Sequence, residues 1–461
     1  MTSESVAPTS EPWLERLGRL SGAFAERYVP DPWIYAISLT LLAMIAAVCV
    51  TEHGVWEVAR AWQGGFWNNK ILTLVAQFSL NLILCTALAR TPLLGRGLRA
   101  LASLPATPRA AIALITLASI ALSLISWALC IIGGALFAQE VARQAARRGY
   151  ALHYPLAIAA GYLGMMTFGL GLTSSAPLIV SAPHHLDALI GVIPFSDTVG
   201  STTSLGILAV VTLICPPLMA AMHPSHAVSC AAASSLAQGD SKQPDTDPDH
   251  RPDTFAERLE TSPLLLKIAA ILPISYFIAH FVIDRKGISI DAMNLSFLCA
   301  VLLLYRSPRA MLTQLSQASG GVWSIVFQFP FYAGLMGIIG ETGLGAQVAA
   351  GFVAVATPET WPTLGIAFSA LLNLFVPSAG GQWFATGEIL VKTSAGFGFS
   401  AAHPVMIEVL GDQLTNMIQP MWALPALALA GLEARHILGY TALAMLAVFL
   451  VYCAGLTLFP I

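Results

Sequence analysis

The chain has 461 residues, of which 56% are hydrophobic and only 10% are charged. Soluble domains carry about 25% charged residues, so this composition excludes an ordinary soluble protein. The net charge of −3 gives no reason to expect a nucleic-acid partner. Because the apolar segments are continuous and do not alternate with polar residues, they predict an all-α polytopic membrane protein and exclude a membrane β-barrel.

The N-terminal segment, residues 1–32, carries many charges and lacks the apolar core and cleavage site of a signal peptide. We therefore expect it to stay on the chain. Apolar residues recur at helical spacing from Trp13 to Phe24, with charged residues on the other faces. This pattern predicts an amphipathic helix on the cytoplasmic side, which lies either on the membrane surface or against the protein itself.

Apolar windows of about 20 residues mark the candidate membrane spans. They lie near 33–52, 70–90, 155–180, 201–222, 264–283, 290–305, 322–341, 403–430 and 437–458. A polar stretch rich in Asp, Pro and Ser lies between two membrane halves and is typical of a flexible linker. The predicted organisation is a cytoplasmic or interfacial segment, a first membrane repeat, a cytoplasmic linker and a second, inverted repeat, at 1–32, 33–222, 223–262 and 263–461.

Two further apolar stretches, 110–142 and 360–392, do not fit simple spans. The first has three arginines before it and three after it, and positive residues remain on the cytoplasmic side of a membrane. Entry and exit on one side predict a re-entrant hairpin, broken at Ser123–Trp127, and the second stretch is broken at Asn373–Trp383. Because protein or a water-filled cavity must cover backbone that is not helical at membrane depth, the hairpins should be buried and functional.

The two membrane halves repeat each other in sequence. Gln77-Phe78 and Gln328-Phe329 are 251 residues apart, and Thr91 and Thr342 have the same spacing. Two connections of the first copy carry arginines where the matching connections of the second copy carry none, and the next connection reverses this difference. The exchange predicts two inverted repeats, each with a re-entrant hairpin and an interrupted transmembrane helix, which is typical of transporters. A channel is disfavoured because no filter motif is visible.

Several long stretches resemble one known family. They are ERYVPDPWIYAISLTLL (26–42), GGFWN (64–68), ALFAQEVAR (135–143), QFPFYAG (328–334), NLFVPSAGGQW (373–383) and NMIQPMWALPALALAGL (416–432). With these segments the chain resembles the bacterial short-chain fatty acid transporters, the acetoacetate and butyrate permeases. The resemblance implies transport of short monocarboxylates across the bacterial inner membrane, with no cofactor besides a coupling H⁺ or Na⁺. It also implies likeness to a wider ion-transporter superfamily, whose members have inverted repeats and often form dimers with an elevator motion.

A short fatty acid anion needs hydrogen-bond donors for its carboxylate and apolar walls for its tail. Helix N-termini at a break supply backbone N–H groups and a partial positive charge. The expected breaks are the two hairpin tips and the helix interruptions at 167–177 and 411–425. The candidate substrate-binding residues at these breaks are Ser126, Trp127, Ser174, Ser175, Asn373, Ser378, Gly380, Gly381, Trp383, Asn416 and Trp422. The alternative for each polar residue is a bond between membrane helices, and for each Trp or Gly it is ordinary packing.

No Lys or Arg lies in the predicted tips or interruptions, so the carboxylate must meet dipoles or a bound cation. Asp412 is the main cation candidate, because an ionisable residue at membrane depth is costly. We expect it to bind Na⁺ with Asn416, Gln419 and backbone carbonyls, or to carry a proton if burial favours its neutral form. Glu408 lies one turn earlier on the same helical face and is a weaker candidate. Either acid could instead lie near an interface.

The chain has no HExxH, nucleophile elbow, P-loop or Cys/His cluster, so we expect neither an enzyme nor a resident metal. Its seven cysteines show no paired spacing. The favoured function is a cation-coupled secondary carrier of short-chain fatty acids, working in the lipid bilayer and, where the resemblance holds, as a homodimer. The alternative is a carrier of dicarboxylates or of another small organic anion, which would need two polar clusters. A membrane scaffold would not need breaks duplicated in both halves.

Overall fold

The computed structural model describes residues 12–225, 254–286, 289–320 and 322–461. Most of the predicted linker lies outside these ranges, and the predicted domain boundaries stay a prediction. Regular structure in the described ranges is entirely helical, which confirms the predicted fold class. Six of the described helices are long and apolar enough to cross a membrane, and a bent pair adds a seventh crossing if it is one span. The six are Pro32–Val50, Pro108–Ile125, Tyr154–Val180, Thr202–Ala221, Pro263–Ile283 and Ala434–Leu458, and the bent pair is Ile325–Glu341 with Leu344–Ala354.

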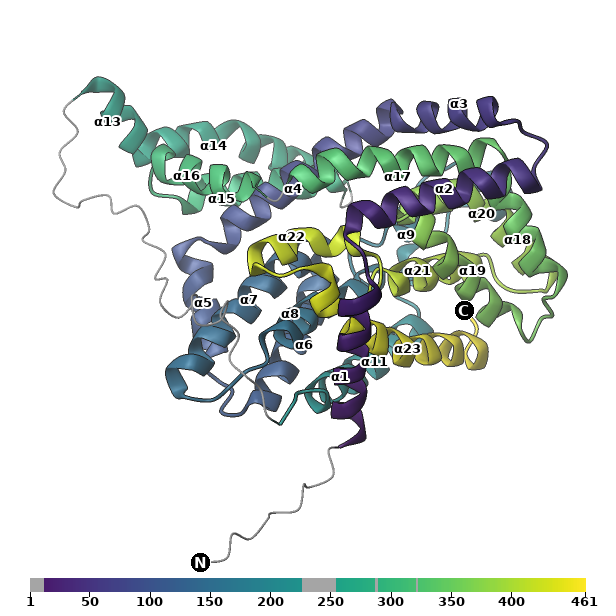
Figure 1. Cartoon of the computed structure of the whole chain (residues 1–461). Coiled ribbons are helices and arrows are strands. Elements are labelled where there is room, and N and C mark those ends of the chain that lie inside the picture. The colour runs from purple at the N-terminus through teal and green to yellow at the C-terminus, as the bar shows by residue number, and fades with distance from the viewer. Residues whose placement is uncertain (1–11, 226–253, 287–288, 321) are drawn as a thin grey trace, which may run out of the picture.

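The helices form two groups that pack mainly among themselves (Figure 1). The first group, here called the plate, comprises α2 (Pro32–Val50), α3 (Val55–Phe66), α4 (Asn69–Ala89), α13 (Phe255–Thr261), α14 (Pro263–Ile278), α15 (Ile290–Leu304), α16 (Pro308–Ser319) and α17 (Trp323–Glu341). The second, here called the bundle, comprises α1 (Trp13–Tyr28), α6 (Pro108–Ile125), α7 (Trp127–Arg148), α8 (Tyr154–Tyr162), α9 (Ser175–Val180), α10 (Asp187–Ile190), α11 (Thr202–Ala221), α19 (Trp361–Phe375), α20 (Ala379–Gly396), α21 (Ala402–Thr415), α22 (Pro420–Ala430) and α23 (Ala434–Leu458). Two helices connect the groups, α5 (Pro92–Ala102) and α18 (Leu344–Ala354).

The two halves of the chain are structural repeats. The order α3 to α9 followed by α11 returns in the second half as α16 to α23. The packing is reciprocal between the halves: α3 packs on α17 as α16 packs on α4, and α7 packs on α22 as α20 packs on α9. Two copies of one unit exchange contacts in this way when a two-fold axis relates them.

The two hairpins, α6–α7 and α19–α20, open toward opposite ends of the molecule. After the first hairpin, the backbone N–H of His153 donates to the ring of His223, which follows the end of α11. After the second hairpin, the hydroxyl of Ser400 donates to the carbonyl of Ile461, which follows the C-terminal end of α23. Helix α23 packs on α11. The start of α11 meets the end of α23, since Thr203 donates to the carbonyl of Phe459. The two helices are therefore antiparallel, and their C-terminal ends, which mark the openings of the two hairpins, lie at opposite ends of the molecule. The repeats are therefore inverted, as the charges predict.

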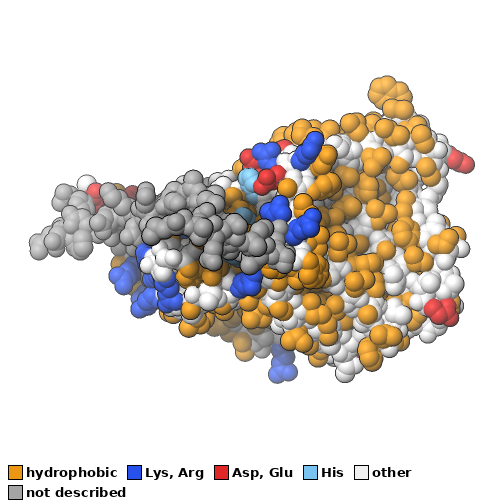
Figure 2. All heavy atoms as spheres, turned by 60° about the horizontal axis from the view of Figure 1, so that its bottom comes forward, with side chains coloured by type: hydrophobic (Ala, Val, Ile, Leu, Met, Phe, Trp, Pro, Cys, Tyr) orange, Lys and Arg blue, Asp and Glu red, His pale blue; other side chains and the backbone are white. Residues whose placement is uncertain are grey.

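Charge is distributed unevenly between these ends. On the face in Figure 2, Lys and Arg gather toward one end together with some Asp and Glu, hydrophobic side chains cover the broad middle, and Asp and Glu without Lys or Arg stand at the other end. The opening of the first hairpin is flanked by arginines, and Arg148 donates to the carbonyl of Pro105 there. The opening of the second hairpin carries Lys392, which pairs with Glu388, and no arginine. This asymmetry is typical of a cytoplasmic end and an external end.

The N-terminal helix α1 combines the two placements that its sequence allows. It packs on α23, where the hydroxyl of Ser21 donates to the carbonyl of Gly439. Its buried Glu15 accepts hydrogen bonds from the backbone and the hydroxyl of Ser225. Its large apolar side chains point outward instead, and 71% of Trp13 and 63% of Phe24 are exposed. The helix thus docks on the bundle through small residues and keeps an apolar face for a membrane surface.

We predict the sidedness of the two ends from this arrangement. A single cysteine at the exposed Arg147 should react with membrane-impermeant thiol reagents only from the cytoplasm, and one at the exposed Asp187 only from outside. Both variants are made in a background without the seven native cysteines, and each is labelled in intact cells and in inverted vesicles. Labelling of both positions from the same side would contradict the inverted arrangement.

The helices α7 and α8 touch backbone to backbone. A Cβ atom at Gly134 would lie 1.9 Å from the carbonyl oxygen of Gly161. Gly134→Val should therefore lower stability by about 3 kcal/mol, because a well-packed core accepts little extra volume. Gly206→Val in α11 is the matched control, since a Cβ there meets nothing within 4 Å. Equal melting temperatures of the two purified variants would argue against this contact.

Candidate functional site

Both hairpin tips are built in the same way, by a serine that caps the second helix. Ser126 caps α7 and accepts a hydrogen bond from the backbone N–H of Ala128 at 3.2 Å. Ser378 caps α20 and accepts from the backbone N–H of Gly381 at 3.3 Å. Each tip therefore presents a helix N-terminus, with its partial positive charge, and a hydroxyl whose proton can still be donated.

In the first repeat, the hairpin tip is bonded to the interrupted helix that follows it. This helix ends at Tyr162, continues as the 3₁₀ turns Leu163–Met166 and Phe168–Leu170, and becomes helical again at Ser175. The hydroxyl groups of Ser123 and Thr167 are 2.8 Å apart. The backbone N–H of Leu172 donates to the carbonyl of Leu124 at 2.8 Å. The interruption thus satisfies a carbonyl that the end of α6 leaves free.

The second repeat joins its hairpin to its interruption through corresponding bonds that use other donor groups. The amide of Asn373 donates to the side chain of Asn416 at 3.0 Å, in place of the serine and threonine of the first repeat. It also donates to the hydroxyl of Thr415 and to the carbonyl of Asp412. The side chain of Gln419 donates to the carbonyl of Leu374 at 3.1 Å and accepts from the backbone at the start of α22. The predicted residues Asn373, Asn416, Gln419 and Asp412 therefore form one connected group.

The two interruptions also contact each other across the repeats. The side chain of Gln413 accepts from the backbone N–H of Gly169 at 2.8 Å and donates to the hydroxyl of Tyr452. The hydroxyl of Tyr162 donates to the carbonyl of Asn416 at 2.8 Å. Gly169 must lack a side chain here, since a Cβ would lie 2.8 Å from the Gln413 oxygen. The breaks of both repeats thus meet at one place in the bundle.

Four aromatic rings form a cluster between the plate and the bundle. Phe78 of α4 and Phe329 of α17, which occupy equivalent positions in the repeats, stack edge to face at 5.6 Å. Trp127 lies beside the capping serine of α7 and is 5.2 Å from Trp422 of α22. Phe78 contacts both tryptophans, at 5.0 and 5.9 Å. The predicted Trp127 and Trp422 are therefore neighbours in an apolar group that begins at the first hairpin tip.

The remaining predicted residues lie in two places. The start of α9 faces the second tip, where the Cβ atom of Ser175 is 4.0 Å from the position that a Cβ of Gly380 would take. Ser174, one residue earlier, is fully buried, and its hydroxyl has no hydrogen-bond partner in the described part of the chain. Gly381 packs against the methyl group of Met336. Trp383 is buried in α20 and makes no ring contact with the four-ring cluster among the described residues.

Two buried acids complete the site. Asp412 and Glu408 both lie in α21, and every residue of this helix is buried. One carboxyl oxygen of Asp412 and both of Glu408 have no hydrogen-bond partner among the described residues. In the same part of the chain, no group of three or more His, Cys, Asp and Glu side chains could hold a metal ion.

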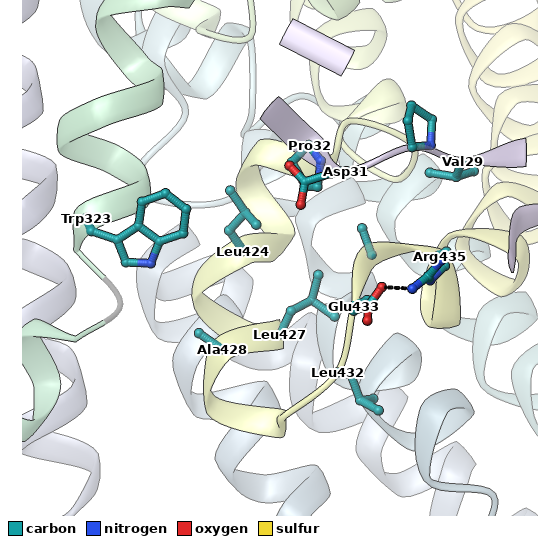
Figure 3. A pocket seen from close by; sticks show the side chains of 12 residues that line it. Val29, Asp31, Pro32, Trp323, Leu424, Leu427, Ala428, Leu432, Glu433 and Arg435 are labelled. Atoms are coloured by element: carbon teal, nitrogen blue, oxygen red, sulfur yellow. Dashed lines mark ion pairs between the residues drawn. The ribbon is translucent and has the colours of Figure 1, made fainter. Parts of the chain in front are cut away.

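A cavity of about 330 Å³ opens beside α22, near its C-terminal end (Figure 3). Leu424 and Leu427 of α22 and Trp323 of α17 form its apolar wall, and Glu433 and Arg435 form an ion pair at its rim. It lies at the boundary between plate and bundle, as the aromatic cluster does. None of the predicted site residues lines it.

Sequence reasoning missed several residues that hold the site together. Gln413, Tyr162 and Tyr452 bridge the repeats, and Tyr332 of the plate donates to the side chain of Gln419 at 3.2 Å. Phe78 and Phe329 were recognised in the sequence as evidence for the repeat, but not as part of the site. That signal could have indicated the site, because residues equivalent in two inverted repeats meet near the axis that relates them.

We predict that Asn373 and Asn416 are energetically coupled. Replacing either with Leu removes a buried hydrogen bond and should cost about 1–3 kcal/mol, because the remaining partner is left unsatisfied. In the double variant neither partner is left unsatisfied by the other's loss, so its loss of stability should be about 1 kcal/mol smaller than the sum of the losses in the two single variants. Reversible unfolding in mixed micelles measures the stability of the wild type, the two single variants and the double variant. Strict additivity would show that the two amides do not interact.

Comparisons with known proteins identify the family. The family model for the short chain fatty acid transporters matches residues 13–459. A relative from Escherichia coli (strain K12), named for this family, is 35% identical over 447 residues, which cover 96% of this chain and 99% of the relative. Another, from Haemophilus influenzae (strain ATCC 51907 / DSM 11121 / KW20 / Rd), is 31% identical over 454 residues, with 96% and 99% covered.

Two solved transporter structures show a weaker likeness. The YdaH transporter of Alcanivorax borkumensis has a TM-score of 0.46 and 15% identity, with 93% of this chain and 97% of that chain covered. The antimetabolite efflux pump MtrF of Neisseria gonorrhoeae has a TM-score of 0.44 and 14% identity, with 96% and 97% covered. The assignment depends on the family match and the two sequence relatives. The chain belongs to the short-chain fatty acid transporter family.

Proposed function

We propose that this protein is a secondary active transporter of short-chain monocarboxylates such as acetoacetate and butyrate. Transport is coupled to a cation and works by alternating access. The protein lies in the bacterial inner membrane, with its N-terminus in the cytoplasm. One observation carries the proposal. The helix interruptions of the two repeats meet in a buried polar group, each is bonded to its own hairpin tip, and the first tip continues into an apolar ring cluster. This arrangement suits an anion with one carboxylate and a short apolar tail.

The carboxylate is bound by dipoles rather than by a fixed positive side chain. No Lys or Arg occurs in either tip or in either interruption. The capping serines Ser126 and Ser378 stand at helix N-termini, which favour anions. The buried hydroxyl of Ser174 has no protein partner in the described chain and is therefore available to a carboxylate. Such donors bind an anion without the cost of burying an additional charged side chain.

The acyl tail lies against the four aromatic rings. Rings bury large apolar areas, and their edge-to-face contacts make the cluster a firm wall. Trp127 joins the wall directly to the capped N-terminus of α7, so carboxylate and tail can be held at the same time. The same wall disfavours the alternative substrate, a dicarboxylate, because the second carboxylate would meet rings instead of donors.

The coupled cation binds near Asp412. The side chains of Asn416 and Gln419 are already engaged in hydrogen bonds, so they position the interruption rather than serve as free ligands. Asp412 keeps an oxygen without a partner in the described chain. A cation there lies close to the substrate anion and lowers the cost of moving either one through the membrane.

Alternating access follows from the inverted hairpins. We propose that both hairpins are re-entrant, the first from the cytoplasm and the second from outside, and that each covers the site from its own side. The cavity beside α22 then lies on the cytoplasmic path, between plate and bundle. Relative movement of the two groups would open one side and close the other.

The function is tested by substrate protection in proteoliposomes. Single cysteines at Ser126 and Ser378 should react slowly with a small thiol reagent, and saturating butyrate should protect both, because one anion occupies both tips. A cysteine at the buried Ser204, in α11 away from the tips, is the matched control and should react equally with and without butyrate. The same vesicles should exchange labelled butyrate. Absence of exchange would overturn the function, and exchange without protection of either tip would overturn the site.

A further inference from the structure

We infer that Glu408 and Asp412 form a proton-carrying pair, and that the cation coupled to transport is therefore H⁺. The inference rests on the proposed function and deepens it by naming the coupling ion and a second acid that takes part.

The pair lies on one face of a helix that is enclosed on all sides. Glu408 and Asp412 are four residues apart in α21, so their side chains are neighbours. The helices α9, α19, α20 and α23 and both 3₁₀ turns of the first repeat pack around α21. Neither acid is exposed by more than 2%. Water therefore does not stabilise a negative charge here.

The surroundings offer no positive charge to either acid. The segments α9 and α19 and both 3₁₀ turns contain no Lys, Arg, His, Asp or Glu. On α20 the charged residues are Glu388 and Lys392, which are exposed and paired with each other. On α23, Arg435 and His436 lie in the first turn, and Tyr440, Tyr452 and Cys453 are uncharged. On α21 itself, His403 stacks on Phe399 at 4.0 Å. Tyr162 of α8 donates to the backbone of Asn416.

The hydrogen-bond inventory of this region has too many acceptors. The buried oxygens without a partner in the described chain come from Glu408, Asp412, Asn373 and Gln382, on three adjacent helices. A carboxylate only accepts hydrogen bonds, so it cannot pair with an amide oxygen. A protonated carboxyl donates one, and it can therefore pair with the amide oxygens or with the other acid. The buried donors without a partner in the described part of these helices are the hydroxyl of Ser369, the indole N–H of Trp383 and the ring of His403, and they are fewer than the acceptor oxygens.

A proton explains this composition better than Na⁺ does. With both acids ionised, a bound substrate anion brings a third negative charge into the site, and one Na⁺ would leave two uncompensated. Protons neutralise the acids without needing several ligands in a fixed geometry. A nearby substrate anion raises the proton affinity of both acids, because like charges disfavour ionisation. By linkage, protonation must raise the affinity for the anion equally, which is the coupling that a symporter needs.

The test measures proton uptake and the pH dependence of transport. Acetoacetate is added to Na⁺-free proteoliposomes that contain a trapped pH dye, and protein-free vesicles give the baseline for passage of the neutral acid. The lumen should acidify faster with the protein. The KM of the wild type should rise above the titration range of the pair by about tenfold per pH unit for each proton that the pair takes up with the anion. In Glu408→Gln this slope should flatten, whereas in the control Glu388→Gln it should stay as in the wild type.

Each outcome separates the inference from the proposed function. Accumulation driven by a Na⁺ gradient at clamped pH, without acidification of the lumen, would overturn the proton pair and leave the transport function intact. An unchanged pH slope in both Glu408→Gln and Asp412→Asn would also overturn it. Failure of the wild type to exchange any labelled short monocarboxylate would overturn the function itself, whatever the pair does.

Discussion

A broken helix inside a membrane must have its free N–H and carbonyl groups satisfied by the protein, because lipid offers no hydrogen bonds. The rest of this structure depends on how that requirement is met. In each repeat the interruption donates to the last carbonyls of the preceding hairpin helix, at Leu124 and at Leu374. Neither hairpin nor interruption can therefore keep its shape alone. The two breaks also bond to each other through Gln413, so all four elements form one unit.

The same constraint produces a place where an anion can be bound. Because these carbonyls are satisfied, the helix N-termini at the tips can face an anion, and their partial charge is positive. The rings of Phe78 and Phe329 come from the plate, and those of Trp127 and Trp422 come from the bundle. The apolar part of the site thus lies at the boundary between the groups, where relative movement changes it most. The buried acids lie in α21, inside the bundle, and move with it.

Much of this arrangement could be predicted from the sequence, because local signals mark it. Arginines on both flanks indicated the first hairpin, and the serine caps lie inside the predicted breaks. The helix α3 was missed because its Glu57 and Arg60 make it too polar for an apolar window, although it packs against α17. The bond between Gly169 and Gln413 joins residues 244 apart in sequence, and no local pattern encodes such a contact. Trp383 was grouped with the tail wall by its motif, but in the described chain it makes no ring contact with the four-ring cluster, and its role stays a prediction.

The central claim is that one anion lies between the two tips with its tail against the four rings. The most direct measurement is a structure of the protein with a short fatty acid that carries bromine at its terminal carbon, located by anomalous scattering. We predict a single bromine position among Phe78, Trp127, Phe329 and Trp422, with the carboxylate at the capped starts of α7 and α20. A bromine in the cavity beside α22 alone, or among the lipid-facing side chains, would contradict the account.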